Sequence, residues 1–156
     1  MHRIVIDDYE KQGPQLAAAI IGLSPEQLCA VPVAGTWSIQ QIVLHLMDSD
    51  LIGADRMKRI IAEERPQLLG FDETAFSQRL FYDQADAGLA AEVFRHNRTL
   101  TAAILRAVPD QAFARVGIHN QRGPMTLDSL VHGYVDHFDH HLRFIKEKRR
   151  LVGNPL

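Results

Sequence analysis

The chain has 156 residues, about the length of one domain, with 46% hydrophobic and 23% charged residues and a formal net charge of −2. These values are ordinary for a globular protein, so they exclude general disorder, and the near-neutral charge excludes a global attraction to nucleic acid. No run of about 18 apolar residues occurs, so no transmembrane helix is expected. We therefore expect one domain over residues 1–156, with no nucleic-acid or membrane partner.

Two features favour a cytoplasmic location. The first 13 residues, MHRIVIDDYEKQG, carry charges where a signal peptide needs its apolar region. The one cysteine, Cys29, excludes an intrachain disulfide, as is common in a reducing compartment. Because Cys29 sits beside apolar residues and has no histidine close in sequence, we expect it to be a buried, unreactive thiol.

The first predicted helix covers about residues 7–21. Asp7 or Asp8 can cap its start, and Gly22 ends it. Pro14 interrupts the pattern, because proline is tolerated only in the first turn of a helix. It therefore either begins the regular helix or kinks it.

Two capping boxes mark the next helices. Ser24-Pro25-Glu26-Gln27 predicts a short helix, and Ser38-Ile39-Gln40-Gln41 predicts a long one that ends before Pro66. His45 lies in the second turn of the long helix, beside its apolar stripe. The stripe consists of Ile39, Ile42, Val43, Leu46, Gly53, Ala54, Met57, Ile60 and Ile61.

The middle of the chain alternates between weak and strong helical patterns. Residues 67–88 predict a loop with a short helix, and residues 89–108 predict a third long helix. Residues 112–124 form a connection with a short extended piece at 113–118 and a turn at 122–124. The positions expected inside the third helix are Leu89, Val93, Leu100, Ile104 and Val108.

The last predicted helix runs from Thr126 to Arg150. Thr126 can accept a hydrogen bond from a first-turn amide, and Asp128 suits the helix dipole at that end. Gly153 and Pro155 stop the helix. Together these segments predict an all-α fold, a four-helix bundle with long loops at about 66–88 and 109–125 that roof a site at one end.

The last helix carries four of the eight histidines of the chain. His137 and His141 are four residues apart, which places their Cβ atoms about 6 Å apart on one helical face. Both flank the apolar stripe, so they point towards the interior of the bundle or its edge. His132 and His140 lie off this line and are weaker candidates for ligands.

Two imidazoles on one helical face can bind a transition metal, which usually needs a third protein ligand. We expect that ligand to be His45, brought opposite the pair by a neighbouring helix. Imidazole suits zinc, nickel, copper or ferrous iron, and three protein ligands leave positions open, as in a catalytic site. Asp48, one turn after His45, is either a solvated residue or one that supports a ligand or acts as a general base. Arg122 is either solvated or stabilises developing negative charge.

Other functional patterns are absent from the sequence. A ferritin-like di-iron site would need two Glu-x-x-His motifs, and no P-loop, dinucleotide-binding, H-E-x-x-H or G-x-S-x-G motif occurs. The residues alone therefore leave two classes open. One is a metal-dependent enzyme, and the other is a helical bundle that binds a ligand or partner without turnover.

Two segments resemble the DinB-like superfamily, which includes the YfiT-type metal hydrolases. Gly35-Thr36-Trp37-Ser38-Ile39 followed by His45-Leu46-Met47-Asp48-Ser49-Asp50 resembles the start of its second helix. Gly123-Pro124-Met125-Thr126-Leu127 followed by His137-Phe138-Asp139-His140-His141 resembles its last helix. The sequence departs from the family at Asp50, where many members carry Glu, and at Leu142-Arg143-Phe144, where many carry Arg-Gly-Gln.

The resemblance implies a four-helix bundle with a three-histidine site for nickel or zinc. Its ligands fall on His45, His137 and His141. Similar proteins include thiol S-transferases that use bacillithiol or mycothiol, and a mycothiol-dependent maleylpyruvate isomerase. We therefore expect a metal-dependent enzyme that transfers a low-molecular-weight thiol to a small electrophile, with a hydrolase as the alternative. The apolar surface of the first and third helices also favours a homodimer.

Overall fold

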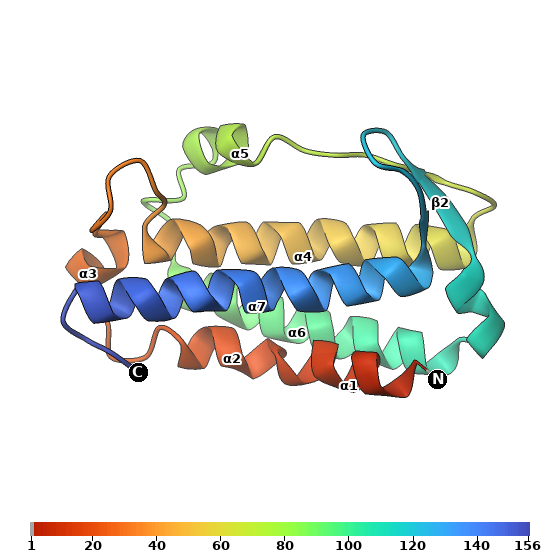
Figure 1. Cartoon of the computed structure of the whole chain (residues 1–156), viewed down its shortest axis with the longest axis horizontal. Helices are drawn as coiled ribbons and strands as arrows, with labels where there is room; N and C mark the ends of the chain where they lie inside the picture. The colour runs from red at the N-terminus through yellow and green to blue at the C-terminus, as the bar shows by residue number, and fades with distance from the viewer. Residues whose placement is uncertain (1) are drawn as a thin grey trace.

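The computed structural model describes residues 2–156 and confirms the all-α four-helix bundle. Its first helical segment is divided into α1 (Arg3–Lys11) and α2 (Gly13–Ala18). The other three segments are α4 (Ile39–Ala62), α6 (Ala87–Ala107) and α7 (Leu127–Leu151). In Figure 1 these segments lie side by side along the length of the molecule.

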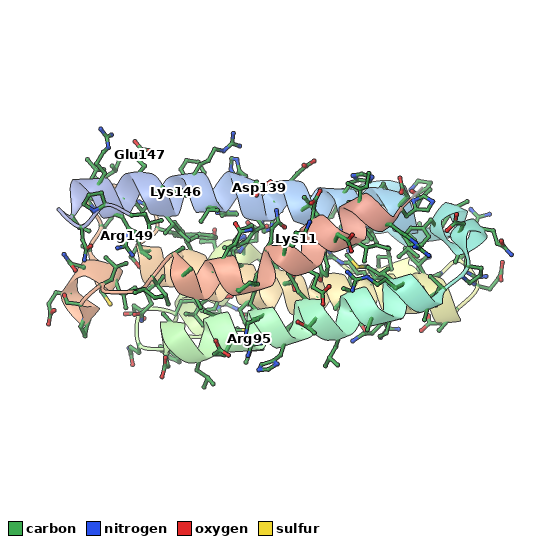
Figure 2. The ribbon with its side chains drawn as sticks, turned by 90° about the horizontal axis from the view of Figure 1, so that it is seen from below. Lys11, Arg95, Asp139, Lys146, Glu147 and Arg149 are labelled. Carbon is green, nitrogen blue, oxygen red and sulfur yellow. The ribbon has the colours of Figure 1, made fainter. Side chains whose placement is uncertain are left out.

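The order of the helices around the bundle brings the second and fourth segments together. α4 packs against both α6 and α7, and α1 packs against α6 and α7 from the other side. Figure 2 shows α1 and α2 lying between α6 and α7. In Figure 1 α4 and α6 run in one direction, and α1, α2 and α7 run in the other. The chain between α4 and α6 must therefore return along the bundle, which accounts for its length.

Both predicted capping boxes are present. Ser24 caps α3 (Pro25–Cys29) by accepting a hydrogen bond from the amide of Gln27, whose side chain accepts from the Ser24 amide in return. Ser38 and Gln41 form the same pair of bonds at the start of α4. Because the cap fixes the first residue of α4, it also fixes His45 in the second turn.

The first helix begins earlier than predicted. It starts at Arg3 after His2, so neither Asp7 nor Asp8 caps it. A break at Gln12 separates α1 from α2, and Pro14 lies in the first turn of α2, where its missing N–H removes no intrahelical bond. The Gln12 side chain donates to the carbonyl oxygen of Val135 on α7, which ties the break to the bundle.

The prediction of which face of the third long helix is buried in the bundle is wrong. Its buried face consists mainly of small alanines, together with Phe94, Thr101, Leu105 and the fully buried Arg98. Alanines allow close approach of neighbouring helices, and an arginine enters the core only because Asp50 pairs with it. A search for large apolar residues misses such a face. The predicted interior residues Leu89, Val93, Leu100 and Ile104 are exposed, by 64%, 37%, 66% and 37% of their surface, and Val108 is half-buried.

Arg98 lies between the two apolar clusters of the core. Its guanidinium carbon is 4.4 Å from the ring centre of Phe94, in one cluster, and 4.2 Å from that of Tyr9, in the other. Its Nε donates to Asp50 Oδ1 at 2.9 Å, and its other nitrogens donate to Gln12 Oε1 and to backbone oxygens. Each of the three nitrogens of this buried cation therefore donates a hydrogen bond within the bundle.

A small sheet joins the two long connections, and sequence analysis did not predict it. β1 (Gln67–Leu68) pairs in parallel with β2 (Val116–His119), and β2 pairs antiparallel with β3 (Gly123–Thr126). The extended piece predicted at 113–118 is partly correct, because a 3-10 helix, η1 (Asp110–Ala114), occupies its start. Strands of two to four residues carry too little alternation to be seen in a sequence.

The first long connection covers the side of the bundle, not its end as expected. α5 (Glu73–Arg79) lies along α4 in Figure 1, and the Phe76 ring packs against that of Phe71 at 4.8 Å. Cys29 is also placed differently from the prediction: its side chain is exposed, with Sγ 3.5 Å from Gln40 Oε1. Among the described residues, no helix combines the length and apolar character needed to cross a bilayer.

Candidate metal centre

His45 from α4 meets His137 and His141 from α7, as the sequence predicted. One nitrogen from each of the three side chains lies within 4.8 Å of the other two. The Nε2 atoms of His45 and His137 are 3.1 Å apart, and the ring centres of the three imidazoles are separated by 4.6–5.1 Å. We call these three residues the histidine triad.

The triad forms because α4 and α7 pack closely. Ile42, Leu46 and Phe138 are buried beside the histidines and hold the two helices together. Two turns further along α4, Gly53 lies against the Tyr134 ring, and a Cβ at Gly53 would be 2.3 Å from Tyr134 Cζ. Only glycine permits this approach, so Gly53 helps to set the spacing at which the histidines meet.

Neighbouring side chains orient His45. Its side chain is 1% exposed, and Ser49 Oγ lies 3.5 Å from Nδ1, one turn along the same helix. The opposite nitrogen, Nε2, is the one that faces His137. The rings of Trp37 and Phe71 lie 4.9 and 6.5 Å from that of His45 and cover it from two connections of the bundle.

The environment keeps all three imidazoles neutral. Burial lowers the pKa of His45 to about 3, with further lowering by the other two histidines. Burial likewise lowers the pKa of His137 to about 3 and that of His141 to about 4. At neutral pH each ring therefore keeps a nitrogen lone pair, which is the form that binds metals.

These residues fit a divalent transition metal. Two nitrogens bound to one tetrahedral zinc are about 3.3 Å apart, which is close to the His45–His137 distance. The Nδ1 atom of His141 is buried and has no hydrogen-bond partner among the described residues, and coordination is one way to satisfy such an atom. A set of imidazoles without carboxylate or thiolate suits zinc, nickel, copper or ferrous iron.

Two cavities of opposite character adjoin the triad. The first, of about 120 Å3, contains His137 in its wall together with Arg56, His119, Arg122, Glu73 and Tyr134. The second, of about 330 Å3, contains His141 together with Val33, Trp37, Ile42 and Phe144, and Lys148 and Glu147 also line it. We call them the cationic cavity and the apolar cavity.

The two predicted catalytic residues have different surroundings. Arg122 is exposed on the turn between β2 and β3 and lines the cationic cavity with His137. Asp48 is half-buried, and its Oδ2 accepts a hydrogen bond from the Tyr82 hydroxyl. Ser49, and not Asp48, is the neighbour of His45 Nδ1. Burial, followed by Asp48, raises the pKa of Tyr82, which keeps that hydroxyl protonated.

The other two histidines of α7 are exposed, and Asp50 is buried in the core. His132 is exposed and lies 3.8 Å from Asp128, and His140 is exposed with its ring against Phe144. Asp50, the position where the sequence departs from the resembled family, holds Arg98 in the core.

Sequence reasoning missed several residues of the site. Ser49 had a usable signal, because it lies four residues after His45 on the same helical face. Arg56, His119 and Tyr134 had none, since they lie on three different elements, α4, β2 and α7, and meet only in the folded chain.

The helical bundle is shared with known proteins. The chain belongs to the DinB superfamily, whose family model matches residues 8–145. It is 30% identical over 145 residues to the Bacillus subtilis protein named "Putative metal-dependent hydrolase YfiT", covering 92% of this chain and 82% of that protein. A Bacillus licheniformis protein with a similar name matches with the same identity and coverage.

Solved structures agree with this assignment. The structure of YfiT from Bacillus subtilis is described as a probable metal-dependent hydrolase with an unusual four-helix bundle topology. It superposes with a TM-score of 0.91 at 29% identity, covering 97% of this chain and 87% of YfiT. The DinB-like protein YjoA of the same organism, at 17% identity, has a TM-score of 0.67 and shares the fold.

Proposed function

We propose that this protein is a metal-dependent enzyme that transfers a low-molecular-weight thiol to a small electrophile. The histidine triad would hold one divalent ion, nickel or zinc. The names of the relatives, which refer to metal-dependent hydrolases, and the neutral imidazole set both support a metal. Bacillithiol and mycothiol are the candidate thiols, because the resembled family includes transferases that use them.

The observation that carries the proposal is that two separate cavities each border one histidine of the triad. His137 belongs to the cationic cavity and His141 to the apolar cavity. A transfer reaction needs a place for each of two substrates beside one reactive centre, and holding both there removes much of the entropic barrier. A hydrolase needs one substrate site and a water molecule, so it leaves the second cavity without a role.

A divalent ion held by the triad would lower the pKa of a thiol brought to it, so that the reactive thiolate is present at neutral pH. Ser49 would keep the His45 ring oriented, and the neutral state of all three rings would keep their lone pairs available. Trp37 and Phe71 would exclude water from the reacting sulfur, which limits competing hydrolysis.

The two predicted catalytic residues receive separate roles in this proposal. Arg122, in the wall of the cationic cavity, would stabilise negative charge next to His137. Asp48 would act indirectly, since its carboxylate is engaged by the Tyr82 hydroxyl. Through that bond it would position the connection in which Tyr82 lies, next to the helix that carries His45.

A direct assay tests the proposal. Protein loaded with zinc or nickel is incubated with bacillithiol, mycothiol or cysteine and with monobromobimane as the electrophile, and the thioether is measured. We expect transfer by the loaded protein, loss of transfer in His45→Ala, and full transfer in His96→Ala, whose histidine is exposed on α6. Transfer that is independent of added metal, or unchanged in His45→Ala, would overturn the assignment.

The names of the relatives favour a second candidate, a metal-dependent hydrolase. In that case the ion would activate water, and the apolar cavity would hold the hydrocarbon part of an ester or amide. Cleavage of small esters or amides that needs metal but no thiol would select this function over thiol transfer. Metal binding with neither activity would select a bundle that binds without turnover.

A further inference from the structure

The cationic cavity contains two arginines that have no acidic partner. Among the described residues, no carboxylate lies within ion-pair distance of Arg56 or Arg122, although Glu73, exposed at the start of α5, also lines the cavity. The two guanidinium groups and the one carboxylate leave a net positive charge. A divalent ion at the triad would add to it, since His137 forms part of the same wall.

Of the two arginines, Arg56 is the stronger indication of a bound anion, because it is buried. Its side chain is 8% exposed, and its two terminal nitrogens donate to the Tyr134 hydroxyl and to the backbone oxygen of Leu69. Its Nε is also buried and has no hydrogen-bond partner among the described residues. A buried charge without a counter-ion is costly, so an arginine held in this way indicates an anion that comes from outside the chain.

The other polar groups of the cavity are arranged as donors. His119 Nδ1 accepts hydrogen bonds from the backbone amides of Gln121 and Arg122, so the neutral ring carries its proton on Nε2 and can donate from there. Burial, followed by the charges of Arg56 and Arg122, lowers the pKa of His119 and keeps the ring neutral. The Tyr134 hydroxyl accepts from Arg56, which leaves its own proton free to donate.

The size of the cavity limits what it can hold. At about 120 Å3 it is well below the roughly 300–1,000 Å3 of a site for a whole drug-sized ligand, so it accepts one end of a molecule. An arginine pairs through two N–H groups with two oxygens of a carboxylate or of a phosphate, and the carboxylate is the smaller of these anions. We infer that the cationic cavity, through Arg56, Arg122 and His119, binds a carboxylate of the small-molecule ligand that reaches the metal; under the proposed function this ligand is the thiol.

The test compares two thiols that differ only in the anionic group. Cobalt-loaded protein is titrated with 3-mercaptopropionate and with its uncharged amide, and the thiolate-to-cobalt absorption gives each dissociation constant. We expect the acid to bind at least about tenfold more tightly than the amide, as a charge-assisted hydrogen bond implies. In Arg122→Gln this preference falls by about the same factor, whereas in Arg143→Gln, an exposed arginine of α7, it stays unchanged.

A second measurement separates the subsite from the proposed function. In metal-free protein, propionate raises the melting temperature of the wild type and of Arg143→Gln, but not of Arg122→Gln, because the anion binds the folded state alone. Equal affinities of the two thiols, or the absence of a propionate effect, overturns the subsite. If neither thiol perturbs the cobalt spectrum while propionate still stabilises through Arg122, the thiol-transfer proposal fails and the carboxylate subsite remains.

Discussion

The Nε2 atoms of His45 and His137 lie 3.1 Å apart across the interface of α4 and α7, although 92 residues separate them in the chain. Two ring nitrogens come this close when they share a proton or a metal ion. One nitrogen of His141 lies within 4.8 Å of a nitrogen of each of the other two rings, and His141 Nδ1 is buried without a hydrogen-bond partner among the described residues, so the geometry favours the metal. The first two predictions follow from this relationship.

The first prediction is metal content. We expect about one divalent ion per chain in protein purified without a histidine tag, because the triad offers one set of converging nitrogens. The double variant His137→Ala, His141→Ala should contain almost none. Removing the ion with a chelator should lower the melting temperature of the wild type, since the ion stabilises only the folded state. His132→Ala, which changes an exposed histidine of the same helix, is the control and should retain its metal.

The second prediction concerns acid stability. The pKa values of the triad are lowered to about 3 for His45 and His137 and to about 4 for His141, against an ordinary value of 6.5. The unfolded chain therefore binds more protons between about pH 6.5 and pH 4, so the free energy of unfolding falls as the pH falls through this window. Urea unfolding of metal-free protein at a series of pH values from 7 to 4 measures this fall in the free energy of unfolding. His141→Gln should show a shallower pH dependence than the wild type, and His96→Gln, at an exposed site, should not.

The third prediction concerns the ion pair in the core. Arg98 and Asp50 are each 1% exposed and joined at 2.9 Å. Arg98→Met removes one partner and leaves Asp50 as an unpaired buried charge, which should lower the free energy of unfolding by about 3–5 kcal/mol. Arg95→Met removes a half-buried arginine of the same helix that pairs with the exposed Glu92, and should cost about 1 kcal/mol or less. Equal losses in urea unfolding of the two variants would contradict this account of the core.

The fourth prediction compares two helical glycines. Gly53→Ala would place a methyl group 2.3 Å from Tyr134 Cζ, so the ring must move and the interface of α4 and α7 is overpacked, at about 1–3 kcal/mol. Gly133→Ala on α7 meets no atom within 4 Å among the described residues, and should gain about 0.5–1 kcal/mol. Thermal unfolding measures both. Because Tyr134 accepts from Arg56, Gly53→Ala should also weaken 3-mercaptopropionate binding.

The fifth prediction is a homodimer. The outward face of α6 carries the exposed Leu89, Val93, Leu100 and Ile104, whose spacing places them on one side of the helix. Such a stripe is costly in water, and a second copy can cover it through an interface that is the same on both chains. Light scattering should give twice the mass of one chain, and Leu100→Glu should shift the mass towards one chain. The mass of a single chain over a wide concentration range would rule this out.

The sequence contained enough local information for the helices and for the ligand pair. Ser38 and Gln41 fix the start of α4 through bonds between neighbouring residues, and the spacing of His137 and His141 sets their common face. Both depend on contacts within about one helical turn, so they can be predicted without the fold. His45 could be proposed as the partner because it lies beside an apolar stripe that has to face the core.

Other features depend on contacts between distant segments, and the sequence does not show them. A charged residue such as Arg98 is ordinarily expected on the solvated face of a helix. It is buried here because Asp50 on α4 and Gln12 after α1 accept its hydrogen bonds. The predicted inner face of α6 was wrong for the same reason: its inner face consists mostly of alanines and includes one neutralised arginine, while Leu89 and Leu100 point outwards. Whether a residue of α6 is buried depends on the side chains that the neighbouring helix places against it. The apolar periodicity of one helix contains no information about a polar partner on another helix.

The sequence by itself therefore determined the class of fold, the helix boundaries near the caps and the three histidines that meet. Tertiary structure alone decided how α4 approaches α7 at Gly53 and that Arg56, His119 and Arg122 line one cavity with His137. Hydrogen bonds between neighbouring residues and the helical period act over short separations, so single-sequence patterns carry them. The site needs side chains from α4, β2 and α7 at one point, and only the packing of the whole bundle brings them there.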